Sequence, residues 1–271
     1  MKLSFSTLAC PDWNMTQIVE IASYSEYDGI ELRFVENEDS IWKLPAFSGT
    51  GLAETRRMLQ DHGLQVACVD TSCRFHFPDA VERSRWIVEG EKMAALAAEL
   101  EAPAIRVFGD TIQPGADRAS TRGWIADAIH DLSEKTGEVE VWLESHGDFS
   151  LAKQTTDIVN DAKTTRAGIL WDPANSWAEH GENPKDQAAV VAPWLRHVHM
   201  KDMRRAENNW RYVMSGEGDF PFDELMQSLR GLEYDGFASF EWEKKWHPEI
   251  EGAEVALPHF VKWFRARYEG E

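Results

Sequence analysis

Leu195-Arg196-His197-Val198-His199-Met200-Lys201-Asp202 has the composition of a short buried strand that ends in polar side chains. Because side chains alternate between the two faces of a strand, His197, His199 and Lys201 share one face. That face must look into a polar cavity, since these are ionisable groups. A single histidine in a strand is more often a core residue whose hydrogen bonds are satisfied than a metal ligand. We therefore expect His199 to have a chemical role only if it finds partners elsewhere in the chain.

Strand and helix patterns alternate along the rest of the chain. Short apolar runs predict strands at residues 2–8, 28–34, 64–70, 104–109, 138–144, 167–172, 195–202 and 236–242. Apolar residues at helical spacing predict helices at residues 15–24, 51–62, 83–100, 122–136, 155–162, 222–229 and 255–268. Eight strands, seven of them followed by a helix, in 271 residues predict an α/β protein, a single (β/α)8 TIM barrel whose one domain spans residues 1–271.

The alternative fold is an open doubly wound sheet. That fold would need a glycine-rich phosphate loop after the first strand, and Leu8-Ala9-Cys10-Pro11 contains no glycine. The sequence therefore favours the barrel. The long connections at residues 34–49 and 203–221 are expected to act as lids over the barrel mouth.

The composition limits the partners and the location of the protein. A formal net charge of −19 opposes binding to the phosphates of nucleic acid or to an anionic membrane. No window approaches the roughly eighteen apolar residues of a membrane span, and the first residues lack the apolar run of a signal peptide. We expect a soluble, cytoplasmic protein whose three cysteines are reduced thiols.

Four late strands end in ionisable residues, namely Glu144, Asp172, His199 and Glu241. In a barrel these ends converge at the rim where active sites form. Taken singly, each acid could be a solvated strand end or the first residue of a turn. Together they would repel one another strongly without a cation. Three carboxylates and one imidazole therefore predict a site for a divalent cation such as Mn²⁺, Mg²⁺ or Co²⁺.

The motifs of the chain resemble those of the xylose isomerase-like TIM barrel superfamily of sugar phosphate isomerases and epimerases. The resemblance is carried by Leu143-Glu144-Ser145-His146, Trp171-Asp172-Pro173-Ala174-Asn175, His197-Val198-His199-Met200-Lys201-Asp202, Gly216-Glu217-Gly218-Asp219 and Phe240-Glu241-Trp242-Glu243.

The resemblance implies one divalent metal ion held by Glu144, Asp172, His199 and Glu241. Mn²⁺ is the preferred ion, with Mg²⁺, Co²⁺ and Zn²⁺ as alternatives. Such barrels commonly form homodimers or homotetramers, although the sequence does not identify an interface.

The implied function is that of an isomerase or epimerase acting on a keto sugar or sugar derivative. Glu144 and Glu241 would transfer protons on either side of a metal-stabilised enediolate. The alternative is a lyase, either a dehydratase or a decarboxylase, acting on a keto sugar, an inosose or a sugar acid. An apurinic-site endonuclease is disfavoured because those enzymes need three metal ions and have a histidine where this chain has Asn175.

Two candidate substrate contacts lie on the strands that carry the metal ligands. His146 lies two residues beyond Glu144 and can contact substrate oxygens, or it can orient Glu144 by a hydrogen bond. Lys201 lies in phase with His199 and can bind a substrate oxygen or carboxylate. Its alternative role is an ion pair with Asp202 or Glu243.

Three further candidates lie closer to the rim. Arg205 matches a substrate-binding arginine of related epimerases. Arg33 ends the second strand and can bind an anionic group, with an interior salt bridge to Glu31 as the alternative. Trp13 can form part of an aromatic wall against sugar C–H groups, together with Trp177, Trp242 and Trp246. The interpretation leaves His197 as a deeper structural residue and His76 as a weaker candidate.

Overall fold

Eight parallel strands close into a barrel in the computed structural model, which describes residues 1–207 and 209–268. Around the barrel the order is β1-β10-β7-β6-β5-β4-β3-β2. The strands are β1 (Lys2–Ser6), β2 (Gly29–Leu32), β3 (Gln65–Arg74), β4 (Ala104–Phe108), β5 (Glu140–Glu144), β6 (Ala167–Trp171), β7 (Leu195–Met200) and β10 (Phe237–Phe240). The predicted (β/α)8 barrel is confirmed.

Helices follow most of the strands. They are α1 (Met15–Tyr24), α2 (Gly49–Asp61), α3 (Ala80–Glu99), α4 (Arg118–Ser133), α5 (Ala152–Asp161), α6 (Pro173–His180), α7 (Pro184–Val191), α8 (Phe222–Gly231) and α9 (Ala253–Tyr268). In the parts of the chain that the structure describes, none of them has the length and apolar character needed to cross a membrane.

The sequence analysis missed α6 and α7. Each begins with a proline, Pro173 or Pro184, which in the sequence looks like a turn signal. Proline is also favoured at the first position of a helix, where its missing N–H is not needed. Asp172 and Asn183 cap the two helices with their side chains, so both short helices have an ordinary N-terminus.

The chain divides into two compact units, which are described separately below. The terminal unit contains Met1–Ala67 and His199–Glu271, and the middle unit contains Cys68–Val198. Two strands, β3 and β7, run from one unit into the other. The expectation of one domain over residues 1–271 stays a prediction.

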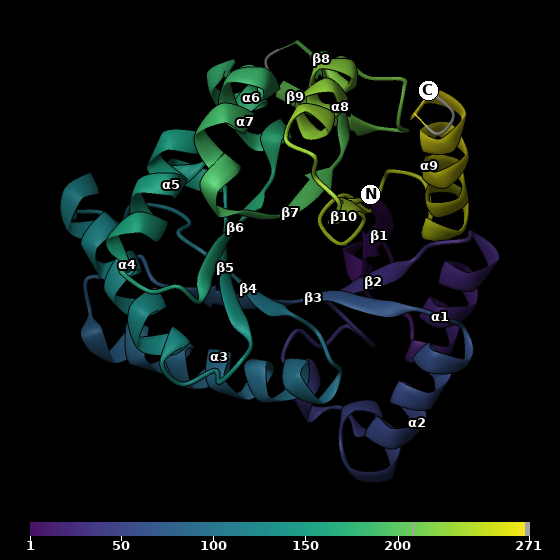
Figure 1. Cartoon of the computed structure of the whole chain (residues 1–271), viewed down its shortest axis with the longest axis horizontal. Coiled ribbons are helices and arrows are strands. Elements are labelled where there is room, and N and C mark those ends of the chain that lie inside the picture. The colour runs from purple at the N-terminus through teal and green to yellow at the C-terminus, as the bar shows by residue number, and fades with distance from the viewer. Residues whose placement is uncertain (208, 269–271) are drawn as a thin grey trace. The chain divides into compact units, whose positions relative to one another are not determined.

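The middle unit is built on strands that are buried on both faces. All five residues of β6 are buried, as expected for a parallel strand covered by helices. Helices α3, α4 and α5 lie along one side of β4 and β5 (Figure 1). A Cβ atom at Gly168 would lie 2.4 Å from Cγ of Arg196 and 3.0 Å from Cδ1 of Trp142. Only glycine therefore allows these side chains to cross β6 at this point.

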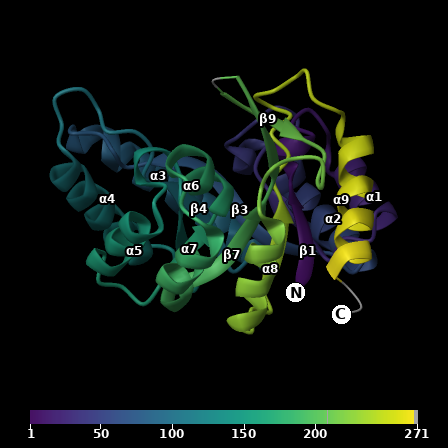
Figure 2. The same ribbon diagram turned by 90° about the horizontal axis from the view of Figure 1, so that it is seen from above.

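In the terminal unit α1 and α9 lie side by side, as Figures 1 and 2 both show. The rings of Phe240 in β10 and Phe260 in α9 stack with centroids 4.4 Å apart. The hydroxyl of buried Tyr27 donates a hydrogen bond of 3.0 Å to the Leu257 carbonyl. These contacts fix α9 against the strands that carry one part of the candidate site.

The connection after β7 contains an antiparallel hairpin, β8 (Asp202–Ala206) and β9 (Asn209–Val213), which the sequence analysis described only as a lid. Figure 2 shows β9 at the opposite end of the terminal unit from the N-terminus. Buried Asp202 closes the connection, since its carboxylate accepts the N–H groups of Gly216 at 2.8 Å, Gly218 at 2.9 Å and Phe220 at 3.4 Å. Burial raises the pKa of Asp202, although these N–H groups act in the opposite direction.

We predict that Asp202→Ala lowers the free energy of unfolding by about 1–3 kcal/mol, because three backbone N–H groups lose their acceptor. Urea denaturation followed by tryptophan fluorescence measures the change. Asp219→Ala is the control, since exposed Asp219 accepts the N–H of Arg205 in the same connection. Equal stability of the two variants, within about 0.5 kcal/mol, would contradict the role given to Asp202.

Candidate active site

The three ionisable residues that share one face of the opening stretch, His197, His199 and Lys201, are all buried, with 2% or less of each exposed. In the middle unit the ring of His197 stacks on Trp142 with centroids 5.7 Å apart and an interplanar angle of 24°. An imidazole packed flat on a core indole contributes mainly to packing. His197 thus has the surroundings of a structural residue, as the sequence interpretation expected.

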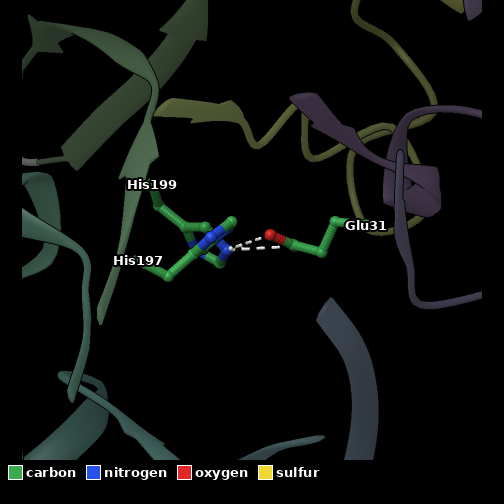
Figure 3. Close-up of side chains that lie close together, drawn as sticks. All are labelled: Glu31, His197 and His199. Carbon is green, nitrogen blue, oxygen red and sulfur yellow. Dashed lines mark hydrogen bonds and ion pairs between the residues drawn. The ribbon is translucent and has the colours of Figure 1, made fainter. Parts of the chain in front are cut away.

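In the terminal unit His199 lies between two carboxylates. Its Nε2 is 3.0 and 3.2 Å from the two carboxylate oxygens of Glu31, and its Nδ1 is 3.4 Å from Oε1 of Glu241 (Figure 3 shows the contact with Glu31). His199 and Glu31 are fully buried, and 5% of Glu241 is exposed. The sequence analysis missed Glu31 as a site residue and considered it only as a partner of Arg33.

Glu241 also contacts Lys201 in the same unit. The Lys201 ammonium donates a hydrogen bond of 2.7 Å to Glu241 and one of 3.2 Å to Glu243. Burial alone would raise the pKa of Glu241, but His199 and Lys201 together hold the pKa of this carboxyl well below its usual range. The group is therefore a carboxylate with a buried proton donor beside it.

Of the two ion pairs considered for Lys201, the structure contains the one with Glu243. The carboxylate of Asp202 instead accepts backbone N–H groups of the connection that follows β9. The Tyr212 hydroxyl of β9 donates a hydrogen bond of 3.4 Å to Glu243, so the hairpin reaches Lys201 through one intermediate side chain.

In the middle unit Glu144 ends β5 and pairs with an arginine that the sequence analysis did not select. Arg106 in β4 places Nε 3.1 Å from Oε2 of Glu144 and Nη2 3.0 Å from Oδ2 of Asp70, and all three residues are buried. A charged residue inside the apolar run from Ile105 to Val107 was the available signal. A buried arginine fixes the positions of both carboxylates with its rigid planar group.

Asp172 follows β6 and also caps α6. Its Oδ1 accepts the N–H groups of Ala174 and Asn175 at 3.0 and 3.2 Å. Its own N–H donates to the Ser145 hydroxyl at 2.8 Å, and the Asn175 amide donates to the Ser145 carbonyl at 3.0 Å. Residue 145 comes directly after Glu144, so these bonds tie the ends of β5 and β6 together.

His146 and His76 lie near one carboxylate of the middle unit. The Nδ1 atoms of both histidines are 3.8 Å from Asp110, whose carboxylate also accepts a hydrogen bond of 3.3 Å from Arg74. Burial lowers the pKa of His76, against the influence of Asp110. The His146 ring lies 4.9 Å from that of Phe108. In this structure both histidines belong to a polar cluster around Asp110.

The remaining basic candidates have different surroundings. Arg33 is buried, and its guanidinium lies 4.3 Å from the centroid of the Phe34 ring. Arg205 is exposed on β8, with its guanidinium 5.6 Å from the Trp210 ring. Both guanidinium groups are thus placed by cation–π contacts with a neighbouring aromatic ring.

The tryptophans of the expected aromatic wall differ from one another. Trp13 is half-buried in the connection from β1 to α1, and its carbonyl accepts the Glu36 N–H at 3.0 Å. Trp246 is 57% exposed and meets the Phe34 ring edge-on at 5.8 Å. Trp242 is fully buried and donates to the Glu251 carbonyl, so it belongs to the core instead of the expected wall.

Comparisons with known proteins identify proteins that are similar to this chain. A 3-dehydroshikimate dehydratase from Bacillus anthracis is 24% identical over 252 residues, which cover 84% of this chain and 85% of the relative. The solved IolI protein with a bound zinc atom is 17% identical, with a TM-score of 0.82 over the whole of both chains. D-psicose 3-epimerase from Clostridium cellulolyticum H10, solved with D-tagatose, is 14% identical, with a TM-score of 0.79 over 98% of this chain and 99% of its own.

The two solved structures show a shared fold. The family is shown by the model described as xylose isomerase-like TIM barrel, which matches residues 19–266. The matched region includes all the strand ends described above except that of β1, and the chain therefore belongs to the xylose isomerase-like TIM barrel family.

Proposed function

We propose that this protein is a divalent-metal-dependent lyase that removes water from a cyclic β-hydroxy ketone. The observation that carries the proposal is the buried hydrogen bond of 2.7 Å between the Lys201 ammonium and the Glu241 carboxylate. It places a proton acceptor and a proton donor side by side, and elimination of water needs both. The curated dehydratase relative, aligned over most of both chains, supports the same reaction class.

Glu144, Asp172, His199 and Glu241 are the proposed metal ligands. One imidazole and three carboxylates, all buried, are a set of donors that fits a divalent cation. When bound, the ion would stabilise the negative charge that develops on the ketone oxygen of the substrate. The zinc atom in the IolI structure supports a divalent metal and leaves the choice between Mn²⁺ and other ions open.

Strand pairing supports grouping these four residues. Glu144 is in register with Leu170 of β6, and Trp171 of β6 is in register with Val198 of β7. Asp172 and His199 are the next residues along those two strands. The Glu241 N–H donates to the Met200 carbonyl at 3.0 Å, which pairs the end of β10 with β7. Neighbouring parallel strands thus present the four ligands at their C-terminal ends.

The proton balance follows from the Lys201–Glu241 pair. Glu241 takes the proton from the carbon next to the ketone, and that C–H bond becomes part of a C=C bond. Lys201 gives a proton to the departing β-hydroxyl, which leaves as water. The hydrogen bond between them then returns the proton from Glu241 to Lys201. Arg106 holds the proposed metal ligand Glu144 in place.

The second candidate is the isomerase or epimerase expected from the sequence. The presence of two glutamates at the strand ends supports it, since each can transfer a proton to or from one face of a carbon. The fold shared with D-psicose 3-epimerase is compatible with it. Epimerisation breaks no C–O bond and needs no donor for a leaving hydroxyl, so Lys201 distinguishes the two reactions.

We predict that the protein loaded with Mn²⁺ or Zn²⁺ eliminates water from 3-dehydroshikimate, the compound that appears in the name of the dehydratase relative. Ultraviolet absorbance follows the conjugated product, and keto sugars in deuterated solvent are tested in parallel. Removal of the metal with a chelator should abolish the reaction, and adding it back should restore it. Deuterium incorporated into a recovered keto sugar or its epimer, without loss of water, would favour the second candidate instead.

We predict that Lys201→Met slows dehydration by about 10²–10⁴-fold, because the leaving hydroxyl loses its proton donor. Exchange of the substrate α-hydrogen with deuterated solvent should persist, since Glu241 remains. The two rates are compared by NMR on the same samples. Lys262→Met, an exposed lysine on α9, is the control and should leave both rates unchanged. An equal fall in both rates would remove Lys201 from the donor role.

We predict that Glu241→Gln lowers turnover by about 10²–10⁴-fold at saturating metal, because an amide cannot accept the proton. Glu144→Gln should lower turnover as well, because it replaces a charged oxygen ligand of the proposed metal site with a neutral amide. Steady-state kinetics with increasing metal concentration separate the loss of the proton acceptor from weaker metal binding. Glu140→Gln is the matched control, since Glu140 begins β5 and pairs with Arg196. Turnover within a few-fold of the wild type in both site variants would refute the proposed proton transfer.

A further inference from the structure

Glu31 is an acid inside a strand that is otherwise apolar. It lies between Ile30 and Leu32 in β2, and none of its surface is exposed. Removing a carboxylate from water costs free energy unless hydrogen bonds or opposite charges replace the water. Nε2 of His199 supplies such a contact, at 3.0 Å from one oxygen and 3.2 Å from the other (Figure 3).

The chemistry of this contact determines which ring nitrogen of His199 carries hydrogen. An ionised carboxylate has only acceptor sites, so the partner nitrogen must donate. Imidazole is a stronger base than carboxylate, so a proton shared by this pair resides on the ring. Nε2 of His199 is therefore the N–H nitrogen, and Nδ1 is the one that points to Glu241, 3.4 Å away.

We propose that Glu31 is a positioning residue that fixes the ring orientation and the Nε2–H tautomer of His199, so that Nδ1 is the metal donor. The inference rests on the metal role given to His199 in the proposed function. A carboxylate behind a ligating histidine also makes the imidazole a better electron donor. Glu31 thus acts on the metal through His199 and is not itself a ligand.

The competing role for Glu31 is that of a metal ligand, because glutamate and histidine side chains are common ligands of divalent metals. The surroundings of His197 argue against that role, since its ring packs on Trp142 in the core of the middle unit. The proposed positioning role therefore requires a single bound ion per chain, and a second ion lost with Glu31 would mark Glu31 as a ligand.

The test measures metal affinity in Glu31→Ala and Glu31→Gln by competition for Zn²⁺ with a coloured chelator. We expect a 10–100-fold weaker affinity in Glu31→Ala. Glu31→Gln keeps the shape of the side chain and can still accept from Nε2, so its loss should be smaller. Asp28→Asn is the control at the start of the same strand, where Asp28 accepts the Leu3 N–H at 2.8 Å. Its affinity should equal that of the wild type.

A second measurement uses the protein without metal. The ¹⁵N signals of His199, assigned by their loss in His199→Asn, should report the Nε2–H tautomer in the wild type and a mixture in Glu31→Ala. Wild-type affinity in both Glu31 variants, or an Nδ1–H tautomer in the wild type, would overturn the inference.

These readouts also separate the inference from the proposed function. If the metal-loaded protein eliminates no water but the Glu31 variants still bind Zn²⁺ more weakly, the proposed lyase fails and the role of Glu31 stands. If the wild type binds Zn²⁺ and dehydrates its substrate while Glu31→Ala binds Zn²⁺ equally well, the proposed lyase stands and the role of Glu31 fails.

Discussion

The ends of the barrel strands depend on the neutralisation of buried carboxylates. In the middle unit Arg106 compensates Glu144, and in the terminal unit Lys201 compensates Glu241. Each acid would be too costly to bury without such a partner. The pairs therefore hold these side chains in place at the strand ends. The same pairs supply the proton donors and acceptors that the proposed chemistry uses.

Much of the fold could be predicted, because the spacing of apolar residues and the local composition depend on only a few neighbouring residues. The apolar run from 167 to 172 and the helical spacing from 15 to 24 each specify an element from a few neighbouring residues. The hairpin of β8 and β9 was not predictable in this way. Its strands are polar and half-exposed. The buried carboxylate of Asp202 closes the connection by accepting backbone N–H groups, and the pattern of side chains in the sequence does not reveal such bonds.

The residues of the candidate site also differ in how far they could be predicted from the sequence. Glu144, Asp172, His199 and Glu241 could be selected because each ends an apolar run at a corresponding point of a βα unit. Glu31 and Arg106 are marked in the sequence only as charged residues inside apolar strands. Their roles depend on partners 168 and 38 residues away in the chain, as the contacts of Glu31 with His199 and of Arg106 with Glu144 show. Sequence patterns thus located the charged strand ends, whereas the residues that hold them in place required coordinates.

The way in which Asp202 closes the connection after β9 has an evolutionary consequence. Its carboxylate holds main-chain N–H groups, which every residue except proline provides, so most side chains between 214 and 220 can vary without loss of this anchor. Gly216 and Gly218 are exceptions, because a Cβ atom would lie 2.4 Å from Nε1 of Trp263 at Gly216 and 2.0 Å from the Asp202 carboxylate at Gly218. A segment anchored through its backbone can change its exposed side chains while the strands of the barrel stay unchanged, so the surface at this connection can diversify without a change of fold.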